Sequence, residues 1–219
     1  MEPLDDAKFS GTKEVAEHLT IEVSNLQPWI DEFVPEAGKI NSIKQFKGGQ
    51  SNPTYKIVTE SKNLVLRRKP PGKLLPSAHA VDREYKVITA LYETDVPVPK
   101  TYGLCEEDDV AGTAFFVMDF LDGDLFWDPM IPSLSNQDRT EIYQNKNKTL
   151  ALLHGVDYKK IGLEDYGKPG NYVARQVSRW SKQYRASETD DIEAMNNLID
   201  WLPKNIPDDD ETSIVHGDY

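Results

Sequence analysis

The sequence predicts an α+β fold in which an antiparallel sheet of five strands is followed by a helical lobe. Three β-prone segments, Ile43–Phe46, Thr54–Thr59 and Asn63–Arg68, follow one another with only short polar connections between them. Strands joined so closely pair with their sequence neighbours in an antiparallel meander. After Leu121 the apolar residues recur at the spacing of helices. This change of period indicates two lobes, the first built on a sheet and the second on helices.

One helix and two further strands complete the predicted sheet lobe. The helix covers residues 79–94, whose apolar residues fall on one face, so it should lie against the sheet. The proline-rich residues that follow it are held extended. They lead into strands at Thr101–Cys105 and Thr113–Phe120.

Residues 1–38 are expected to form an N-terminal helical extension ahead of the sheet lobe, which we place at residues 39–122. Its first part, Met1–Gly11, is polar. Beyond it, apolar residues at helical spacing predict two short helices, and Ser24 is a candidate N-cap for the second of them.

Residues 123–219 are expected to form the helical lobe. Ser135 has an acidic residue three positions later, which is a pattern typical of a helix start, and this helix should run to His154. Two more helices are predicted at about residues 172–185 and 190–202 from the spacing of their apolar residues.

The last residues of the chain are the first candidate for chemistry. Ile214 and Val215 are β-branched and apolar, which predicts a short buried strand that carries His216 and Asp218 onto a loop. Because His-Gly-Asp is a common tripeptide, it indicates an active site only together with the motifs that precede it.

Composition limits the partners of the protein. The formal net charge is −12, whereas binding to nucleic acid requires concentrated Lys and Arg, so no nucleic-acid partner is expected. No apolar run is long enough to span a membrane, and the acidic N-terminus does not resemble a signal peptide. Cys105 is the single cysteine of the sequence, which favours a reducing, intracellular compartment.

Several motifs occur in the order of the kinase fold: a glycine-bearing turn, a basic residue on the third strand, an acidic residue in the next helix, a hinge strand and a final His-Gly-Asp. This order resembles the aminoglycoside phosphotransferase-like small-molecule kinases. Within that family, the chain is similar to the kinase-like N-terminal domains of certain acyl-CoA dehydrogenase family proteins. The resemblance implies a two-lobe, protein-kinase-like fold whose helical lobe is truncated. The closest matches are Gly49–Thr54, Leu66–Gly72, Leu75–His79, Pro97–Pro99 and Arg175–Tyr184.

The turn at residues 48–52 is the predicted phosphate-binding element. Backbone N–H groups around Gly48, Gly49 and Asn52 could cradle phosphate oxygens, and the Ser51 hydroxyl could assist them. A plain hairpin turn would have a similar composition, so the assignment depends on the rest of the pattern.

The third strand and the next helix supply a predicted charged pair. Because strand side chains alternate, Val65 and Arg67 share one face of the sheet. In the kinase register, this places Val65 at the adenine and Arg67 at the phosphates, where the wider pattern has lysine. Glu84 lies in the right helix to pair with Arg67, although it could also be a surface residue of that helix. Arg68 and Lys69 are expected to be solvated residues at the strand end.

The resemblance places the adenine-binding hinge at Met118, Asp119 and Phe120. Backbone groups of Asp119 and Phe120 are expected to bond the adenine. An alternative of equal weight is that Met118 and Phe120 are simply core residues.

Asp218 is the predicted catalytic residue. It would accept a hydrogen bond from the acceptor hydroxyl, orient it and take its proton late in the reaction. His216 is assigned to the same catalytic loop, where it is expected to fix the loop by hydrogen bonding. Gly217 replaces the arginine of the protein-kinase motif, which disfavours regulation by a phosphorylated activation loop.

The resemblance implies an ATP-dependent phosphotransferase that acts on a small-molecule hydroxyl, such as that of a hydroxyacyl-CoA in fatty-acid oxidation. Its expected cofactors are ATP and Mg²⁺. The metal-binding residues of the family follow the catalytic loop, so no metal ligand is expected in this chain, and residues 1–219 are expected to be inactive alone. The alternative is a non-catalytic module of the same fold that binds a nucleotide or an acyl ligand.

One helical face carries Arg175, Arg179 and Lys182. Three cations in this arrangement could bind an acyl-CoA phosphate, although a charged helix face is usually only the solvated one. The resemblance suggests a peroxisomal or mitochondrial location, and the alternative is a cytoplasmic one.

Overall fold

The computed structural model describes residues 10–48, 52–72, 79–208 and 211–219. It divides into two compact units, residues 1–152 and 153–219, which are described separately. The boundaries of the extension, sheet lobe and helical lobe given above stay predictions. Within the described ranges, no helix is both long enough and apolar enough to cross a membrane.

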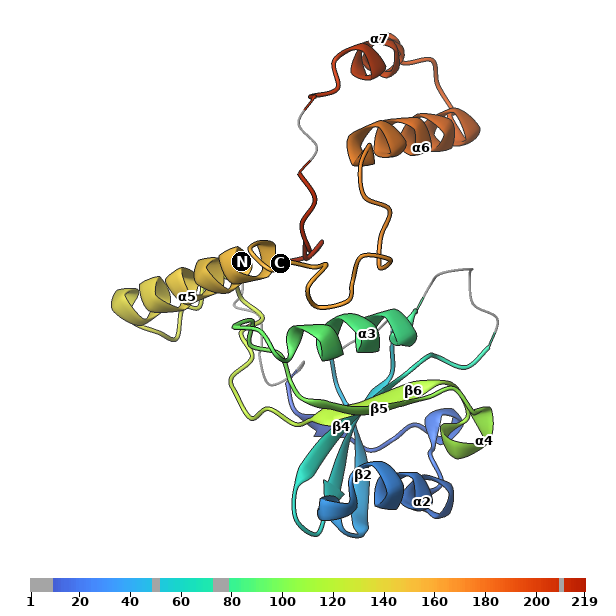
Figure 1. The fold of residues 1–219 in the computed structure, drawn as a ribbon, viewed down its shortest axis with the longest axis vertical. Helices are drawn as coiled ribbons and strands as arrows, with labels where there is room; N and C mark the ends of the chain where they lie inside the picture. Colours follow the sequence, from blue (N-terminus) through green and yellow to red (C-terminus); the bar gives the residue numbers. More distant parts are fainter. Residues whose placement is uncertain (1–9, 49–51, 73–78, 209–210) are drawn as a thin grey trace. The chain divides into compact units, whose positions relative to one another are not determined.

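A six-stranded sheet forms the centre of the first unit (Figure 1). Its spatial order is β1-β2-β3-β4-β6-β5, and every neighbouring pair is antiparallel. The predicted meander of three strands is therefore confirmed. The sheet has one strand more than the five predicted. The strands are β1 (Thr12–Lys13), β2 (Ile40–Phe46), β3 (Thr54–Thr59), β4 (Asn63–Arg68), β5 (Thr101–Cys105) and β6 (Phe115–Asp119).

The hydrophobic core lies on one face of this sheet and is covered by helix α2 (Val23–Phe33). Leu26 and Ile30 of α2 are completely buried, and Trp29 meets the ring of Phe115 edge-on with the ring centroids 5.1 Å apart. The N-terminal extension is thus part of the sheet's own core. Burial of these side chains supplies the main driving force for docking the helix.

Two details of this extension differ from the prediction. The first expected helix is a single 3₁₀ turn, η1 (Glu17–Leu19). Ser24 is not the N-cap of α2, which begins after Glu22; the Ser24 hydroxyl contacts the side chain of neighbouring Asn25. Ser24 lies already within the first helical turn, where its hydroxyl cannot accept the bonds that a cap accepts. A second 3₁₀ turn, η2 (Pro35–Ala37), leads into β2.

Helix α3 (Val81–Leu91) lies on the other side of the sheet from α2 (Figure 1). Val81 and Leu91 are buried, and the ring of Tyr85 is 6.1 Å from that of Phe116 on β6. The predicted docking of this helix against the sheet is confirmed. The same face of the sheet carries the residues of the candidate site.

The burial of Arg68 contradicts the prediction that it is solvated, because its side chain is only 4% exposed. Its guanidinium donates to the backbone carbonyls of Ala111 and Leu19 and lies over the ring of Tyr55, 5.2 Å from the ring centroid. The strand register places Arg68 on the core face, where these two carbonyls need donors. The long apolar stem of the arginine packs in the core while its head satisfies them.

We expect Arg68→Met to lower the free energy of unfolding by about 1–3 kcal/mol, because an unsatisfied buried carbonyl costs about that much. Most of the lost stability should come from the Ala111 carbonyl, which loses its donor. The Leu19 carbonyl keeps a 3.1 Å hydrogen bond from the Tyr55 hydroxyl. Chemical denaturation measures the change. Lys69→Met is the control, because Lys69 is partly exposed and pairs only loosely with Asp82 at 3.6 Å. Equal stability of the two variants would contradict this account of Arg68.

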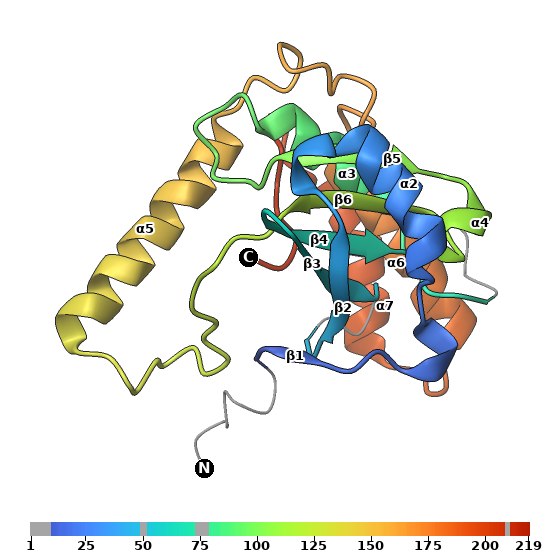
Figure 2. The ribbon, with the colours of Figure 1, turned by 90° about the horizontal axis from the view of Figure 1, so that it is seen from below.

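After β6 the chain runs through an irregular segment into helix α5 (Asn136–His154), as Figure 2 shows. The predicted start of this helix is confirmed, because the backbone N–H of Asp138 donates to the Ser135 hydroxyl at 3.2 Å. A four-residue helix, α4 (Asp108–Ala111), lies between β5 and β6.

The second unit contains helices α6 (Tyr172–Ser187) and α7 (Glu193–Trp201) and the 3₁₀ turn η3 (Leu202–Lys204). Ile214 and Val215 do not form the predicted strand, and Val215 is 66% exposed. An apolar pair becomes a strand only when another segment completes its hydrogen-bond ladder. No strand of the described residues pairs with it.

Candidate functional site

An ion pair between Arg67 and Glu84 is the centre of the candidate site in the first unit. Arg67 projects from β4 and Glu84 from the first turn of α3, and the guanidinium donates to both carboxylate oxygens, through Nε and through Nη2, the latter at 3.3 Å. The two side chains are 28% and 35% exposed, so the pair is reachable from solvent. A bidentate pair of this kind fixes the plane of the guanidinium.

Thr54 gives Arg67 a further contact across the sheet. The two residues are directly opposite in the β3–β4 register, and Arg67 Nη1 donates to the Thr54 hydroxyl at 3.1 Å. The same hydroxyl donates to the backbone carbonyl of Asn52 at 3.0 Å. Sequence reasoning did not assign Thr54 to the site, although pairing the two predicted strands would have placed it beside Arg67.

The side chain of Asn52 makes contacts that were not predicted, while the phosphate-binding role predicted for its backbone stays a prediction. Its side chain is 2% exposed and its amide nitrogen donates to Glu84 at 3.0 Å. Its amide oxygen is 2.8 Å from Nδ1 of His79. No pattern in the sequence indicated a role for His79, because its partner lies 27 residues away along the chain.

The rest of the predicted phosphate-binding turn is only partly described. Gly48 is partly buried and lies two residues after the end of β2. Gly49 and Ser51 lie outside the described residues, so their predicted roles stay predictions.

Val65 lies on the same face as Arg67 and is 7% exposed. It is directly opposite Lys56 on β3, and the Lys56 amine lies 4.0 Å from the ring centroid of Phe120. Phe46 lies nearly parallel to Phe120, with the ring centroids 6.3 Å apart. Val65 and Phe120 of this group were predicted to lie at the adenine, and these roles stay predictions. Lys56 is an addition that the sequence reasoning did not foresee.

Asp119, a predicted hinge residue, makes hydrogen bonds through both its side chain and its backbone. Its carboxylate is 2.9 Å from the Lys62 amine and accepts a hydrogen bond from the Tyr102 hydroxyl at 2.7 Å. Its backbone N–H donates to the carbonyl of Lys100 at 2.9 Å. That N–H is therefore already used, which leaves Phe120 as the predicted hinge residue for an N–H contact with the adenine. Met118, half-buried, lies opposite Val65.

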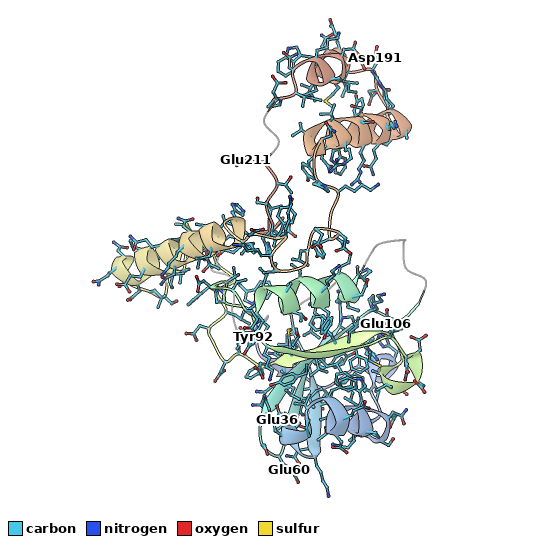
Figure 3. All side chains as sticks on the ribbon, viewed as in Figure 1. Glu36, Glu60, Tyr92, Glu106, Asp191 and Glu211 are labelled. Carbon is cyan, nitrogen blue, oxygen red and sulfur yellow. The ribbon has the colours of Figure 1, made fainter. Side chains whose placement is uncertain are left out.

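The network around Asp119 shifts the pKa values of Asp119 and Lys62 in opposite directions. Burial alone would raise the pKa of Asp119, but the hydrogen bonds from Lys62 and Tyr102 outweigh it and lower that pKa. Burial would lower the pKa of Lys62, and its bonds to the same two partners raise it. Glu36, labelled in Figure 3, adds a carboxylate 3.9 Å from the Lys62 amine. The ion pair therefore stays charged over the whole neutral range.

In the second unit, the residues predicted to be catalytic lie in an exposed turn. The backbone N–H of Asp218 donates to His216 Nδ1 at 3.2 Å, and the His216 ring meets that of Tyr219 edge-on. The Asp218 carboxylate makes no hydrogen bond or ion pair with the described residues. The catalytic roles of His216 and Asp218 stay predictions.

The three cations of helix α6 are not equivalent. Arg175 is partly buried and donates to the carbonyls of Gly170 and Lys168, so it closes the loop before its own helix. Arg179 and Lys182 are exposed. Neither unit contains, in its described part, a group of three or more His, Cys, Asp or Glu side chains that could hold a metal ion.

Comparison with known proteins identifies the family. The sequence model of the phosphotransferase enzyme family matches residues 42–219. A crystal structure of a Ralstonia eutropha protein classed with the aminoglycoside phosphotransferases is 49% identical, with a TM-score of 0.80, over 91% of this chain and 59% of that one. Acyl-CoA dehydrogenase family member 10 of mouse is 47% identical over 81% of this chain.

More distant structures share only the fold. The GDP complex of an aminoglycoside 2'-phosphotransferase-IIIa mutant is 16% identical, with a TM-score of 0.54, and covers 83% of this chain and 56% of its own. The chain spans between 17% and 28% of the length of curated relatives such as the mouse protein. The predicted kinase-like fold is thus confirmed, and the chain belongs to the phosphotransferase enzyme family.

Proposed function

We propose that this chain is the nucleotide-binding part of an ATP-dependent phosphotransferase that phosphorylates a small-molecule hydroxyl. The observation that carries the proposal is the Arg67–Glu84 pair on the sheet face opposite the core. Phosphoryl transfer leaves little covalent chemistry to the protein and depends on holding and neutralising the phosphates. A fixed guanidinium beside a predicted phosphate-binding turn is suited to that task.

An arginine suits this position because of the number of its N–H donors. Arginine carries five N–H donors in a rigid fork. Within the described residues, Nε, one N–H of Nη2 and one N–H of Nη1 are used by Glu84 and Thr54. One N–H on each Nη is then left, so two donors remain for phosphate oxygens. A lysine held by the same two partners would have only one donor left.

The nucleotide is proposed to lie with its base near Val65 and Phe120 and its phosphates at Arg67. The apolar cluster of Phe46, Val65 and Phe120 suits a purine, since planar bases pack well on aromatic and aliphatic groups. A distant fold relative is a GDP complex, which adds support for a nucleotide at this fold's site. Mg²⁺ would neutralise the triphosphate, as in other phosphotransferases.

The acceptor is proposed to be the hydroxyl of a hydroxyacyl-CoA. The support is that relatives covering 81% of this chain are named as acyl-CoA dehydrogenase family members. Arg179 and Lys182 on α6 are candidate contacts for the CoA phosphates, because both are exposed. Arg175 contributes less to such a contact, because its guanidinium is bonded to carbonyls of its own loop.

Transfer of ³²P from [γ-³²P]ATP in the presence of Mg²⁺ tests this function. The assay uses a longer protein that includes this chain and the metal-binding residues of the family, because residues 1–219 are expected to be inactive alone. The acceptors would be a 3-hydroxyacyl-CoA, the same acyl-CoA without the hydroxyl, and an aminoglycoside. Label on the hydroxyacyl-CoA alone is the expected result. Label on the aminoglycoside alone would overturn the acceptor, and ATP binding without transfer to any hydroxyl would favour a binding module.

A further inference from the structure

A chain of hydrogen bonds extends the Arg67–Glu84 pair to two residues whose side chains do not bond to Arg67. Asn52 donates to Glu84, and His79 contacts the amide oxygen of Asn52. We propose that Asn52 and His79 are positioning residues, an inference that rests on the function proposed above. They hold the Glu84 carboxylate, and through it the guanidinium of Arg67, in the orientation that binds phosphate.

The direction of each bond follows from the groups involved. A carboxylate only accepts hydrogen bonds, so the Asn52 atom beside Glu84 must be the amide nitrogen. The amide oxygen then faces His79 and can only accept, so Nδ1 of His79 must carry a proton. Glu84 thus determines the amide orientation of Asn52, and Asn52 determines the tautomer of His79. Neutral His79 is the Nδ1–H tautomer.

Burial makes Asn52 an effective link. At 2% exposure its side chain cannot exchange its partners for water, so each of its bonds is costly to lose. The Glu84 oxygen that Asn52 contacts is the one that Arg67 reaches at only 3.3 Å through Nη2. Without Asn52, that oxygen is free to rotate away and the bidentate geometry weakens.

His79 is held in a conformation that costs free energy. Its φ is +59°, in the left-handed region that residues other than glycine rarely adopt. Its carbonyl accepts from the N–H of Val81 at 2.9 Å, immediately before the first turn of α3, which contains Glu84. The surrounding structure must hold such a residue in place, and the Asn52 amide is a direct contact that does so. The link therefore connects the residues before β3 with the start of α3.

Three substitutions of His79 separate the hydrogen bond from the backbone strain. His79→Asn keeps an N–H donor at the same number of bonds from the backbone, and asparagine tolerates the left-handed region. His79→Gly relieves the strain but removes the donor, and His79→Ala removes the donor while keeping the strain. We expect the ATP dissociation constant to stay near the wild-type value in His79→Asn. It should rise about fivefold in the other two, equivalent to about 1 kcal/mol.

The controls address stability and the wider function. His18→Ala removes an exposed histidine and should leave ATP affinity unchanged. His79→Gly should be at least as stable to heat as His79→Ala, so a loss of affinity in both cannot be attributed to unfolding. Wild-type affinity in His79→Gly would overturn the positioning role, because the donor would then be unnecessary.

A measurement without nucleotide separates this inference from the proposed function. Long-range ¹H–¹⁵N NMR of the histidine rings reports which nitrogen carries the proton, and we expect His79 to be protonated at Nδ1. A neutral Nε2–H tautomer would overturn the hydrogen-bond chain, even in a protein that binds ATP. Failure of the wild type to bind ATP, with Nδ1–H observed, would instead overturn the proposed function and leave the link itself supported.

Discussion

Asp218→Asn is expected to lower the turnover number for phosphotransfer by about 10²–10⁴-fold, the range that a positioned general base contributes. Asparagine has nearly the same size but cannot take the proton of the acceptor hydroxyl. The Asp218 carboxylate makes no hydrogen bond or ion pair with the described residues, so its loss should not disturb the local fold. Single-turnover transfer from labelled ATP, measured in the longer protein that includes this chain, reports the effect.

The dissociation constant of ATP is the second readout for this variant. It should not change, because Asp218 is proposed to act on the acceptor and not on the nucleotide. Asp200→Asn, which changes an exposed aspartate on α7, serves as the matched control and should keep full activity. An Asp218→Asn protein that turns over at the wild-type rate would show that another group orients the hydroxyl.

Glu84→Ala is expected to weaken ATP binding about tenfold, equivalent to about 1.4 kcal/mol. The substitution removes both acceptors that fix the Arg67 guanidinium, and it also removes the partner of Asn52. The freed guanidinium then loses conformational entropy when it binds phosphate, a loss that the ion pair avoids in the wild type. Titration calorimetry with ATP measures the change.

Asp82→Ala is the matched control for Glu84→Ala. Asp82 lies on the same helix and forms a looser ion pair, with Lys69 just after β4 at 3.6 Å. Both substitutions remove one negative charge from the same turn, so a general electrostatic effect on ATP would appear in both. We expect weakened binding in Glu84→Ala alone. Partly exposed pairs contribute about 0–1 kcal/mol to folding, so both variants should remain folded.

The strands were the part of the fold that the sequence predicted best. β3, β4 and β5 begin and end at the predicted residues, because polar turns and prolines mark their ends in the sequence. β1 was missed because a strand of two residues has no alternation to detect. The predicted strand at Ile214 and Val215 was wrong, because β propensity alone does not supply a pairing partner.

Side-chain partners were harder to predict than elements. Strand alternation placed Arg67 on the correct face, and the order of motifs indicated Glu84 as its partner. The prediction that Arg68 is solvated was wrong because its carbonyl partners lie 43 and 49 residues away in sequence. No local pattern reveals the paths of those segments. His79 was missed for the same reason. Long-range polar contacts depend on the packed fold and leave no periodic signal in the sequence.

Arg67 is proposed to bind the phosphates of a nucleotide. The most direct measurement compares the dissociation constants of ATP and adenosine for the wild type and Arg67→Met, which keeps the length of the apolar stem. We expect the variant to lose about 10- to 100-fold in affinity for ATP, as removal of charged hydrogen bonds predicts, and none for adenosine. Unchanged ATP affinity, or an equal loss for both ligands, would contradict the claim.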